Sequence, residues 1–161
     1  IWSTPEVAWY GYTMQQAKDR GISPIEGMAL YKECLRGVVF SPDGLLKIVV
    51  DEATRAIIGV HVVGTDACEI IHYGMELVRS GRTLDDLLGA TYSAVTFHEL
   101  YGVAARAASD PAAARMRRRA AGAAWANIER ARSSMDSSSS GRIEKTTPTT
   151  PIPTPKPLYA R

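Results

Sequence analysis

The sequence predicts an α+β fold: an antiparallel β-sheet covered on one face by helices, with a helical or disordered C-terminal extension. Strand-like segments come first and helical segments follow, without a βαβ alternation. Short polar turns separate the apolar runs, as they do in antiparallel hairpins. Residues 1–110 carry nine Lys and Arg against fourteen Asp and Glu, whereas residues 111–161 carry ten against three. An acidic folded part therefore precedes a basic extension.

The N-terminal segments are predicted to form two strands and a short helix. Thr4–Thr13 has the β-branched and aromatic content of a strand. Pro5 is expected at its start or on an edge, because proline lacks the ladder N–H. Met14–Arg20 is predicted as a helix capped by Thr13. Ile25–Cys34 is predicted as the second strand.

The clearest unit is a hairpin. The apolar runs Leu45–Val50 and Ala56–Val63 flank the polar turn Asp51–Arg55. A third apolar run, Gly37–Phe40, ends at a Ser-Pro-Asp-Gly turn and is expected to add another antiparallel strand.

Polar residues within the hairpin indicate which face of the sheet is more exposed. Lys47 and His61 interrupt the apolar runs, and His61 is interpreted as an ordinary strand residue. Cys34 and Cys68 have no CxxC spacing, and the histidines fall at no ligand spacing, so no metal site is predicted. Two isolated cysteines are typical of free thiols in a reducing compartment.

Helices follow the hairpin. Asp66–Arg79 is predicted as a helix in which Asp66 is the N-cap and Glu69 completes a capping box. The face toward the sheet is predicted to be Ile70, Gly74, Leu77 and Val78. Gly74 indicates close packing against another backbone, because a mid-helix glycine costs about 1 kcal/mol relative to alanine. Leu84–Leu88 is predicted as a short helix.

The stretch Thr91–Ala105 contains the best candidates for chemistry. It consists of a polar loop followed by a helix, with Thr96, His98 and Glu99 at the junction. Taken alone, this pattern predicts a helix start, in which Thr96 caps the backbone amides and Glu99 closes a capping box.

Four motifs occur in a fixed order: TPEVA at Thr4–Ala8, GLLKI at Gly44–Ile48, IIGVH at Ile57–His61 and EIIH at Glu69–His72. Together they resemble the C-terminal dimerisation domain of the pyridine nucleotide–disulfide oxidoreductases. These FAD flavoproteins include glutathione reductase and dihydrolipoamide dehydrogenase. The resemblance covers residues 1–107.

That family's last motif is His-Pro-Thr followed by a glutamate. In its disulfide-reducing members the His exchanges a proton with the reactive thiol and the Glu orients it, in the active site of the partner subunit. Here Thr96 and Glu99 match the Thr and Glu, which places Ala94 at the His position and Val95 at the Pro position. Using His98 as the base would lose the other matches, so it is expected to be a packing or surface residue.

The resemblance is closest to the soluble pyridine nucleotide transhydrogenases, which pass a hydride between NADH and NADP(H) through FAD without a thiol base. Ala94 departs from that branch, which tends to have an aromatic residue there. The resemblance implies the dimerisation domain of such a homodimeric flavoprotein, separated from its upstream FAD- and NAD(P)-binding domains and inactive alone. Thr96 and Glu99 would lie near the partner's flavin, and no residue of this chain would be catalytic.

Two alternatives stay open. One is the dimerisation domain of a disulfide reductase, such as dihydrolipoamide dehydrogenase or glutathione reductase, whose base comes from elsewhere. The other is a non-catalytic dimerisation or scaffold module. The chain starts with Ile1 instead of Met, which indicates a piece of a longer protein.

Three regions are expected: residues 1–107 as the dimerisation domain, 108–133 as a basic Ala/Arg-rich helical extension, and 134–161 as a disordered Ser/Thr/Pro-rich tail. No apolar run approaches the roughly 18 residues that a membrane span needs. Neither GxGxxG nor GxxxxGK[ST] occurs, so these residues alone are expected to bind no dinucleotide. Nucleic-acid binding is not expected of the folded part and is left open for the extension. The expected location is the cytoplasm, or alternatively the mitochondrial matrix.

Overall fold

The computed structural model describes residues 3–110 together with Ala112, Met116, Arg119 and Gly122. The described elements run in the order β1 (Val7–Gly11), α1 (Met14–Asp19), β2 (Pro24–Leu30), the 3₁₀-helix η1 (Tyr31–Glu33), α2 (Leu35–Phe40), β3 (Gly44–Asp51), β4 (Ile57–Gly64), α3 (Ala67–Arg79), α4 (Leu84–Gly89) and α5 (Glu99–Ser109). The predicted α+β class is confirmed. The expected tail, 134–161, and most of the expected extension, 108–133, lie outside the described residues.

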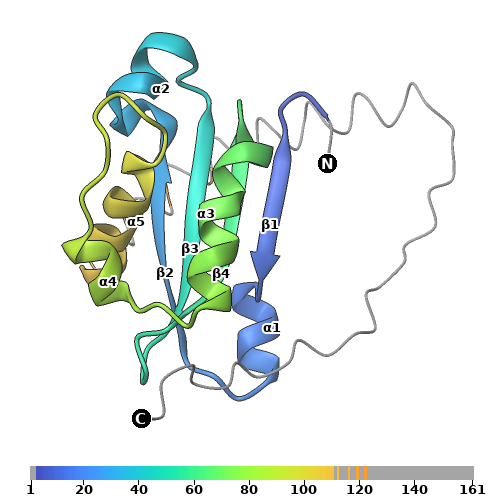
Figure 1. Cartoon of the computed structure of the whole chain (residues 1–161). Coiled ribbons are helices and arrows are strands. Elements are labelled where there is room, and N and C mark those ends of the chain that lie inside the picture. The colour runs from blue at the N-terminus through green and yellow to red at the C-terminus, as the bar shows by residue number, and fades with distance from the viewer. Residues whose placement is uncertain (1–2, 111, 113–115, 117–118, 120–121, 123–161) are drawn as a thin grey trace, which may run out of the picture.

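The four strands form one antiparallel sheet in the order β1-β4-β3-β2. Figure 1 shows α3 and α5 side by side in front of this sheet. Side chains alternate between the two faces of a strand, so each row of paired residues belongs to one face. The row through Ile48 and Val60 faces the helices, because Val60 contacts α3 at Gly74. The row through Lys47 and His61 therefore faces away from them.

The predicted hairpin is confirmed as β3 and β4. Its turn is closed by the Asp51 carboxylate, which accepts hydrogen bonds from the Ala53 amide (3.0 Å) and the Thr54 hydroxyl (2.8 Å). Arg55 follows with a φ of 60° and forms an ion pair with Asp85 at the start of α4, at 2.7 Å. The hairpin turn and α4 are thus joined at one end of the molecule.

The third predicted strand is wrong. Residues 37–40 belong to helix α2, which follows the short turn of η1. The reason lies in the topology: β3 pairs with β2 on one side and with β4 on the other, which leaves no edge of β3 for another strand. The helix leaves four large apolar side chains exposed, with exposed fractions of 57% for Leu35, 59% for Val38, 63% for Val39 and 66% for Phe40.

Two of the predicted helix caps, Thr13 and Asp66, have different outcomes. Thr13 caps α1 and forms a complete capping box with Gln16, so that cap is confirmed. Asp66 is the N-cap residue of α3, but its φ of 60° puts it in the left-handed region and its side chain caps nothing. Side-chain capping normally needs an extended N-cap backbone. The Glu6 carboxylate, from the segment before β1, accepts the Cys68 amide hydrogen bond at 3.0 Å instead.

The core lies between the sheet and the two long helices. The predicted inner face of α3 is confirmed, since Ile70, Gly74 and Leu77 are buried and Val78 packs against the core. A β-carbon at Gly74 would lie 2.8 Å from Val60 Cγ1 and 2.7 Å from the Tyr101 hydroxyl oxygen. The close neighbours of Gly74 are therefore side chains, and the expected contact with another backbone is wrong.

Of the helices in the described part of the chain, none has the length and apolar character that a membrane crossing requires.

The packing at Gly74 predicts a destabilising Gly74→Ala substitution. Alanine favours a helix intrinsically, but the added methyl group would collide with Val60 and Tyr101, and such overpacking costs about 1–3 kcal/mol. A β-carbon added at Gly89, at the end of α4, would have no neighbour within 4 Å, so Gly89→Ala is the matched control. Urea denaturation should show a lower unfolding free energy for Gly74→Ala and an equal or higher one for Gly89→Ala. Equal losses for both would contradict this packing.

The position of His61 predicts a pH-dependent stability. Burial lowers the pKa of His61, the nearby Lys47 lowers it further, and the hydrogen bond from Nε2 to the Tyr12 carbonyl (3.2 Å) opposes the shift. The unfolded chain, where His has a pKa of about 6.5, then binds more protons than the folded chain. The unfolding free energy should fall as the pH drops below that value and through the folded pKa. His61→Gln should reduce this fall, whereas His72→Gln, at an exposed position on α3, should retain it.

Candidate functional site

The candidate site is the loop of residues 91–98, which connects α4 to α5. Its backbone is unusual at Val95, which has a φ of 61°. This left-handed conformation is rarely adopted by a β-branched residue and costs of order 1–3 kcal/mol. Such strain often occurs where a loop's shape matters for function.

Thr96 and Glu99 are brought together as the sequence predicted, but their hydrogen bonds form only half of a capping box. The Glu99 carboxylate accepts the Thr96 amide hydrogen bond at 3.2 Å. The Thr96 hydroxyl donates to the Ser93 carbonyl at 2.8 Å and does not cap the helix. The helix begins at Glu99 with His98 as N-cap, so the predicted Thr96 cap is wrong. The Thr96 hydroxyl therefore stabilises the turn from Ser93 to Thr96, which precedes the helix.

Ala94 is exposed at the turn before Val95. Its methyl group offers no proton donor or acceptor at the position that the resemblance assigns to a histidine.

Neither described cysteine forms a disulfide. Cys34 is buried, its thiol donates to the Tyr31 carbonyl at 3.3 Å, and burial raises its pKa. A thiol with a raised pKa is a poor nucleophile.

His98 is exposed and lies against aromatic rings. Its ring centroid is 5.9 Å from that of Tyr73 on α3 and 6.2 Å from that of Tyr101 on α5, and it stacks on Tyr101. Tyr92 contacts Tyr73 edge-on at 6.4 Å. This packing agrees with the surface role expected of His98. Sequence reasoning missed Tyr73 and Tyr92, because α3 and the loop meet only in the folded chain.

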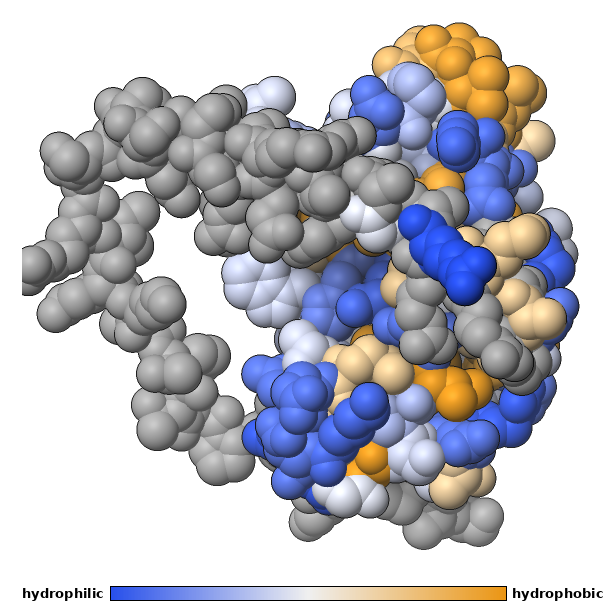
Figure 2. All heavy atoms as spheres, turned by 180° about the vertical axis from the view of Figure 1, so that it is seen from behind, coloured by the Kyte–Doolittle hydropathy of each residue, from blue (hydrophilic) through white to orange (hydrophobic). Residues whose placement is uncertain are grey.

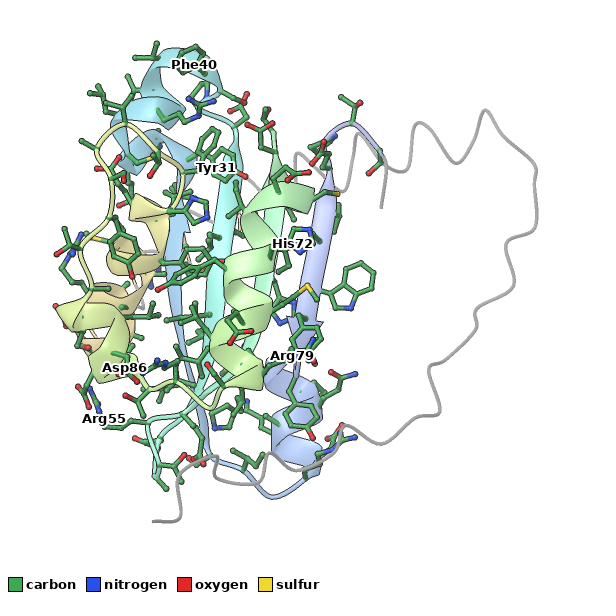
Figure 3. The ribbon with its side chains drawn as sticks, viewed as in Figure 1. Tyr31, Phe40, Arg55, His72, Arg79 and Asp86 are labelled. Carbon is green, nitrogen blue, oxygen red and sulfur yellow. The ribbon has the colours of Figure 1, made fainter. Side chains whose placement is uncertain are left out.

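Phe97 anchors the loop to the end of the domain where η1 and α2 lie. It is buried, and its ring lies 4.5 Å from that of Tyr31, whose hydroxyl donates to the Thr65 carbonyl at 2.9 Å. The Arg36 guanidinium of α2 lies over the Phe97 ring at 5.5 Å and over the Phe40 ring at 4.9 Å. Figure 3 shows Tyr31 and Phe40 at this end of the domain. The loop and α2 therefore form one continuous surface.

Two shallow hollows flank Thr96 and His98. One has a volume of about 260 Å³ and is lined by Tyr73, Thr91, Tyr92, Ser93, Thr96 and His98. The other, of about 320 Å³, is lined by Arg36, Asp66, Glu69, Ile70, Thr96, Phe97 and His98. Pockets that enclose a drug-sized ligand have volumes of about 300–1,000 Å³. One hollow lies below this range and the other at its lower end, so these residues fit one wall of a larger site better than a complete flavin site.

Within residues 3–110 and the four described residues beyond them, no group of three His, Cys, Asp or Glu side chains is arranged to hold a metal ion. The residues around the loop can thus supply backbone and hydroxyl contacts, an aromatic surface, the Arg36 guanidinium and the carboxylates of Asp66, Glu69 and Glu99.

The dimerisation domain of the pyridine nucleotide-disulphide oxidoreductases matches residues 1–105 of this chain. The chain belongs to this family. It is 34% identical over 106 residues to the soluble pyridine nucleotide transhydrogenase of Mycobacterium bovis (strain BCG / Pasteur 1173P2). It is 35% identical over 109 residues to the enzyme of the same name from Yersinia pestis (strain Pestoides F). Each match covers 65% of this chain and only 23% of the relative's length.

Solved structures show the same fold at lower identity. LpdA from Mycobacterium tuberculosis superposes with a TM-score of 0.61 at 21% identity, covering 66% of this chain and 23% of that one. The HOCl-induced flavoprotein disulfide reductase RclA from Escherichia coli, as its Cu(II) complex, gives a TM-score of 0.61 at 20% identity, covering 66% and 24%. At this identity the likeness establishes the fold alone.

The strained backbone at Val95 predicts a stabilising substitution. Val95→Asn should raise the unfolding free energy by roughly 0.5–1 kcal/mol, because asparagine tolerates the left-handed conformation that valine resists. The side chain is 41% exposed, so its apolar contacts contribute little. Val38→Asn on α2, which is 59% exposed in a helix, is the control and should not stabilise. Denaturant unfolding of the two variants checks this, and a loss of stability in Val95→Asn would show that the loop does not hold this backbone.

Proposed function

We propose that this chain is the dimerisation domain of an FAD-dependent, transhydrogenase-like flavoprotein that transfers hydride between NADPH and NAD. The chain would be inactive alone, since it spans about a quarter of the length of the transhydrogenases that it matches. Family membership and the names of these relatives support the proposal. The deciding observation is the loop that keeps Thr96 and Glu99 in contact but has an alanine at position 94.

The chemistry explains why Ala94 matters. A dithiol–disulfide reaction needs a group that takes and returns a proton at the reactive thiol, and alanine has none. Glu99 is also in use, because its carboxylate accepts the Thr96 amide hydrogen bond. Hydride transfer through a flavin needs no thiol base. Bound FAD would supply the redox chemistry, while Thr96, Glu99 and their loop would close one side of the partner's flavin site.

Self-association follows from the family, and the exposed surface suggests where it occurs. The outward face of α3 is mostly polar, with Glu69, His72, Glu76 and Arg79 exposed. The exposed end of α2 is apolar instead, as the patch at one end of the molecule in Figure 2 shows. Because Arg36 joins α2 to the loop at Phe97, a dimer contact at this end would bring the loop toward the partner. We include the α2 end, with the sheet and α3, in the proposed interface.

Location is proposed as cytoplasmic, because the matched relatives are named soluble enzymes. Residues encoded before Ile1 would separate the alternatives. Two GxGxxG motifs without a CxxxxC pair support a transhydrogenase, and the same motifs with that pair support a disulfide reductase. If neither motif is found, the remaining alternative is a dimerisation scaffold.

The proposal predicts the activity of the longer protein. The protein that includes the upstream domains should bind flavin and transfer hydride from NADPH to an NAD analogue, as followed by absorbance. Thiol alkylation should leave this rate unchanged. Ala94→His should not create disulfide reductase activity, because a new base finds no partner cysteine pair. Strong inhibition by alkylation together with disulfide turnover would overturn the proposal.

The proposed interface predicts a dimer that depends on α2. The double substitution Val39→Asp with Phe40→Asp should weaken self-association by at least about tenfold, because it puts charges on an apolar contact. Sedimentation equilibrium measures the association constant. Leu88→Asp is the control, since Leu88 is 40% exposed on α4, away from α2. Equal effects of the two changes would remove α2 from the interface.

A further inference from the structure

A single arginine contacts both phenylalanines of this chain. The sequence contains two phenylalanines, Phe40 at the end of α2 and Phe97 in the candidate loop. The Arg36 guanidinium lies over both rings, 4.9 Å from the centroid of Phe40 and 5.5 Å from that of Phe97. A cation within about 6 Å of a ring centroid is attracted by the quadrupole of the ring. Arg36 therefore contacts one ring in each of two neighbouring segments.

The two rings have opposite surroundings. Phe40 is 66% exposed and lies at the outer end of the domain, as Figure 3 shows. Phe97 is 4% exposed and packs on Tyr31, which is fully buried. Arg36 itself is half-buried. Its side chain thus extends from the exposed end of α2 to the buried residue that anchors the loop.

The charge of Arg36 is held by the rings and not by an acid. The ion pairs of the described residues involve Lys47, Arg55 and Arg82 instead. Asp66 and Glu69 line the same hollow as Arg36, but neither forms an ion pair with it in the described structure. Arginine suits this role, because its planar guanidinium is weakly hydrated and stacks on aromatic faces.

The position of Phe97 affects the whole candidate site. Its carbonyl accepts the Leu100 amide hydrogen bond at 3.1 Å, in the first turn of α5. Its neighbours Thr96 and His98 line both hollows of the site. A displacement of Phe97 would therefore move the residues that face a ligand or a partner.

We propose that Arg36 is a positioning residue that links the contact at α2 to the geometry of the candidate loop. Covering α2 would remove water from the Phe40 ring and from the guanidinium, and the attraction between a cation and a ring is stronger where water is excluded. The guanidinium would then hold Phe97 more firmly. The link is reciprocal, so a loop in which Phe97 is held firmly favours association. The inference rests on the proposed interface at α2 and is independent of the proposed redox chemistry.

Fluorine NMR of the full chain tests this link, because para-fluorophenylalanine gives one signal for Phe40 and one for Phe97. Phe40→Leu assigns the two signals. In a dilution series across the association midpoint, which sedimentation measures on the same samples, both signals should move with that midpoint. If dilution does not separate the subunits, Val38→Asp with Val39→Asp supplies the separated form, since both phenylalanines remain.

Substitution of Arg36 tests whether this side chain carries the link. In Arg36→Gln the Phe97 signal should no longer change on association, and the association constant should fall about threefold to tenfold. The variant should still fold, because the close contact of Gly37 with the Tyr31 carbonyl remains. Arg36→Lys should restore only part of the change, because an ammonium group does not stack flat on a ring. Lys32→Gln removes an exposed charge from η1 and is the control, which should behave like the unchanged chain.

Each other outcome overturns the proposal. A Phe97 signal that stays constant while the Phe40 signal moves would mean that α2 binds the partner without affecting the loop, and the α2 interface would stand. A Phe97 signal that still moves in Arg36→Gln would assign the link to another contact. Association without a change in the Phe40 signal, or no association, would remove the α2 interface and this inference together. The hydride-transfer assay of the longer protein tests the redox proposal separately.

Discussion

The close approach of two helices to the sheet is the constraint on which the rest of the structure depends. There is no space for a side chain at Gly27, under α5, or at Gly74, where α3 meets Val60 and Tyr101. Tyr101 then joins the two helices, because its hydroxyl donates to the Ile70 carbonyl at 2.8 Å. A buried hydroxyl needs such a partner, since its desolvation costs energy when it is left unpaired. These contacts set the start of α5, and with it the end of the candidate loop.

The loop keeps its shape through ring packing and a hydrogen bond to the backbone. Phe97 packs on Tyr31, and Glu99 accepts the Thr96 amide. Ala94 contributes nothing to this framework and is exposed. A substitution at position 94 is therefore expected to leave the fold unchanged. Under the proposed function, this separation would let the same loop structure serve with or without a base at that position.

Sequence patterns predicted the elements whose signals are local. The β3–β4 hairpin has a polar turn between two apolar runs, and the Thr13 capping box needs only residues three positions apart. The α2 helix could not be predicted from local patterns, because its apolar run is equally typical of a strand. Only the sheet topology excludes a strand next to β3, since β2 and β4 already occupy both of its edges. Aspartate is a favoured N-cap residue, but Asp66 has a left-handed backbone and its side chain does not cap α3.

The candidate site shows the same division. The contact between Thr96 and Glu99 was predictable from spacing, whereas the direction of the Thr96 hydroxyl depends on the turn at Ser93. The sequence gives no sign of the positive φ at Val95, because β-branched residues rarely adopt it. Tyr73 and Tyr92 join the site only because α3 lies beside the loop. The missed tyrosines are therefore tertiary in origin, whereas the turn at Ser93 and the backbone of Val95 are local features without a sequence signal, and the resemblance to a family supplied the register that local patterns lacked.

The two apolar surfaces of the described domain differ in a way that separates their roles. The α2 end is exposed by more than half at each of its four large side chains, and it adjoins the loop. The sheet face away from α3 and α5 also has apolar residues, but Leu30 and Leu45 on it are each only 9% exposed and Val63 only 4%. Burial of apolar area stabilises an association only when that area is exposed to water beforehand. Under the proposed function, the exposed end of α2 therefore has more apolar area to offer to a partner than these strand residues have, and it lies beside the candidate loop.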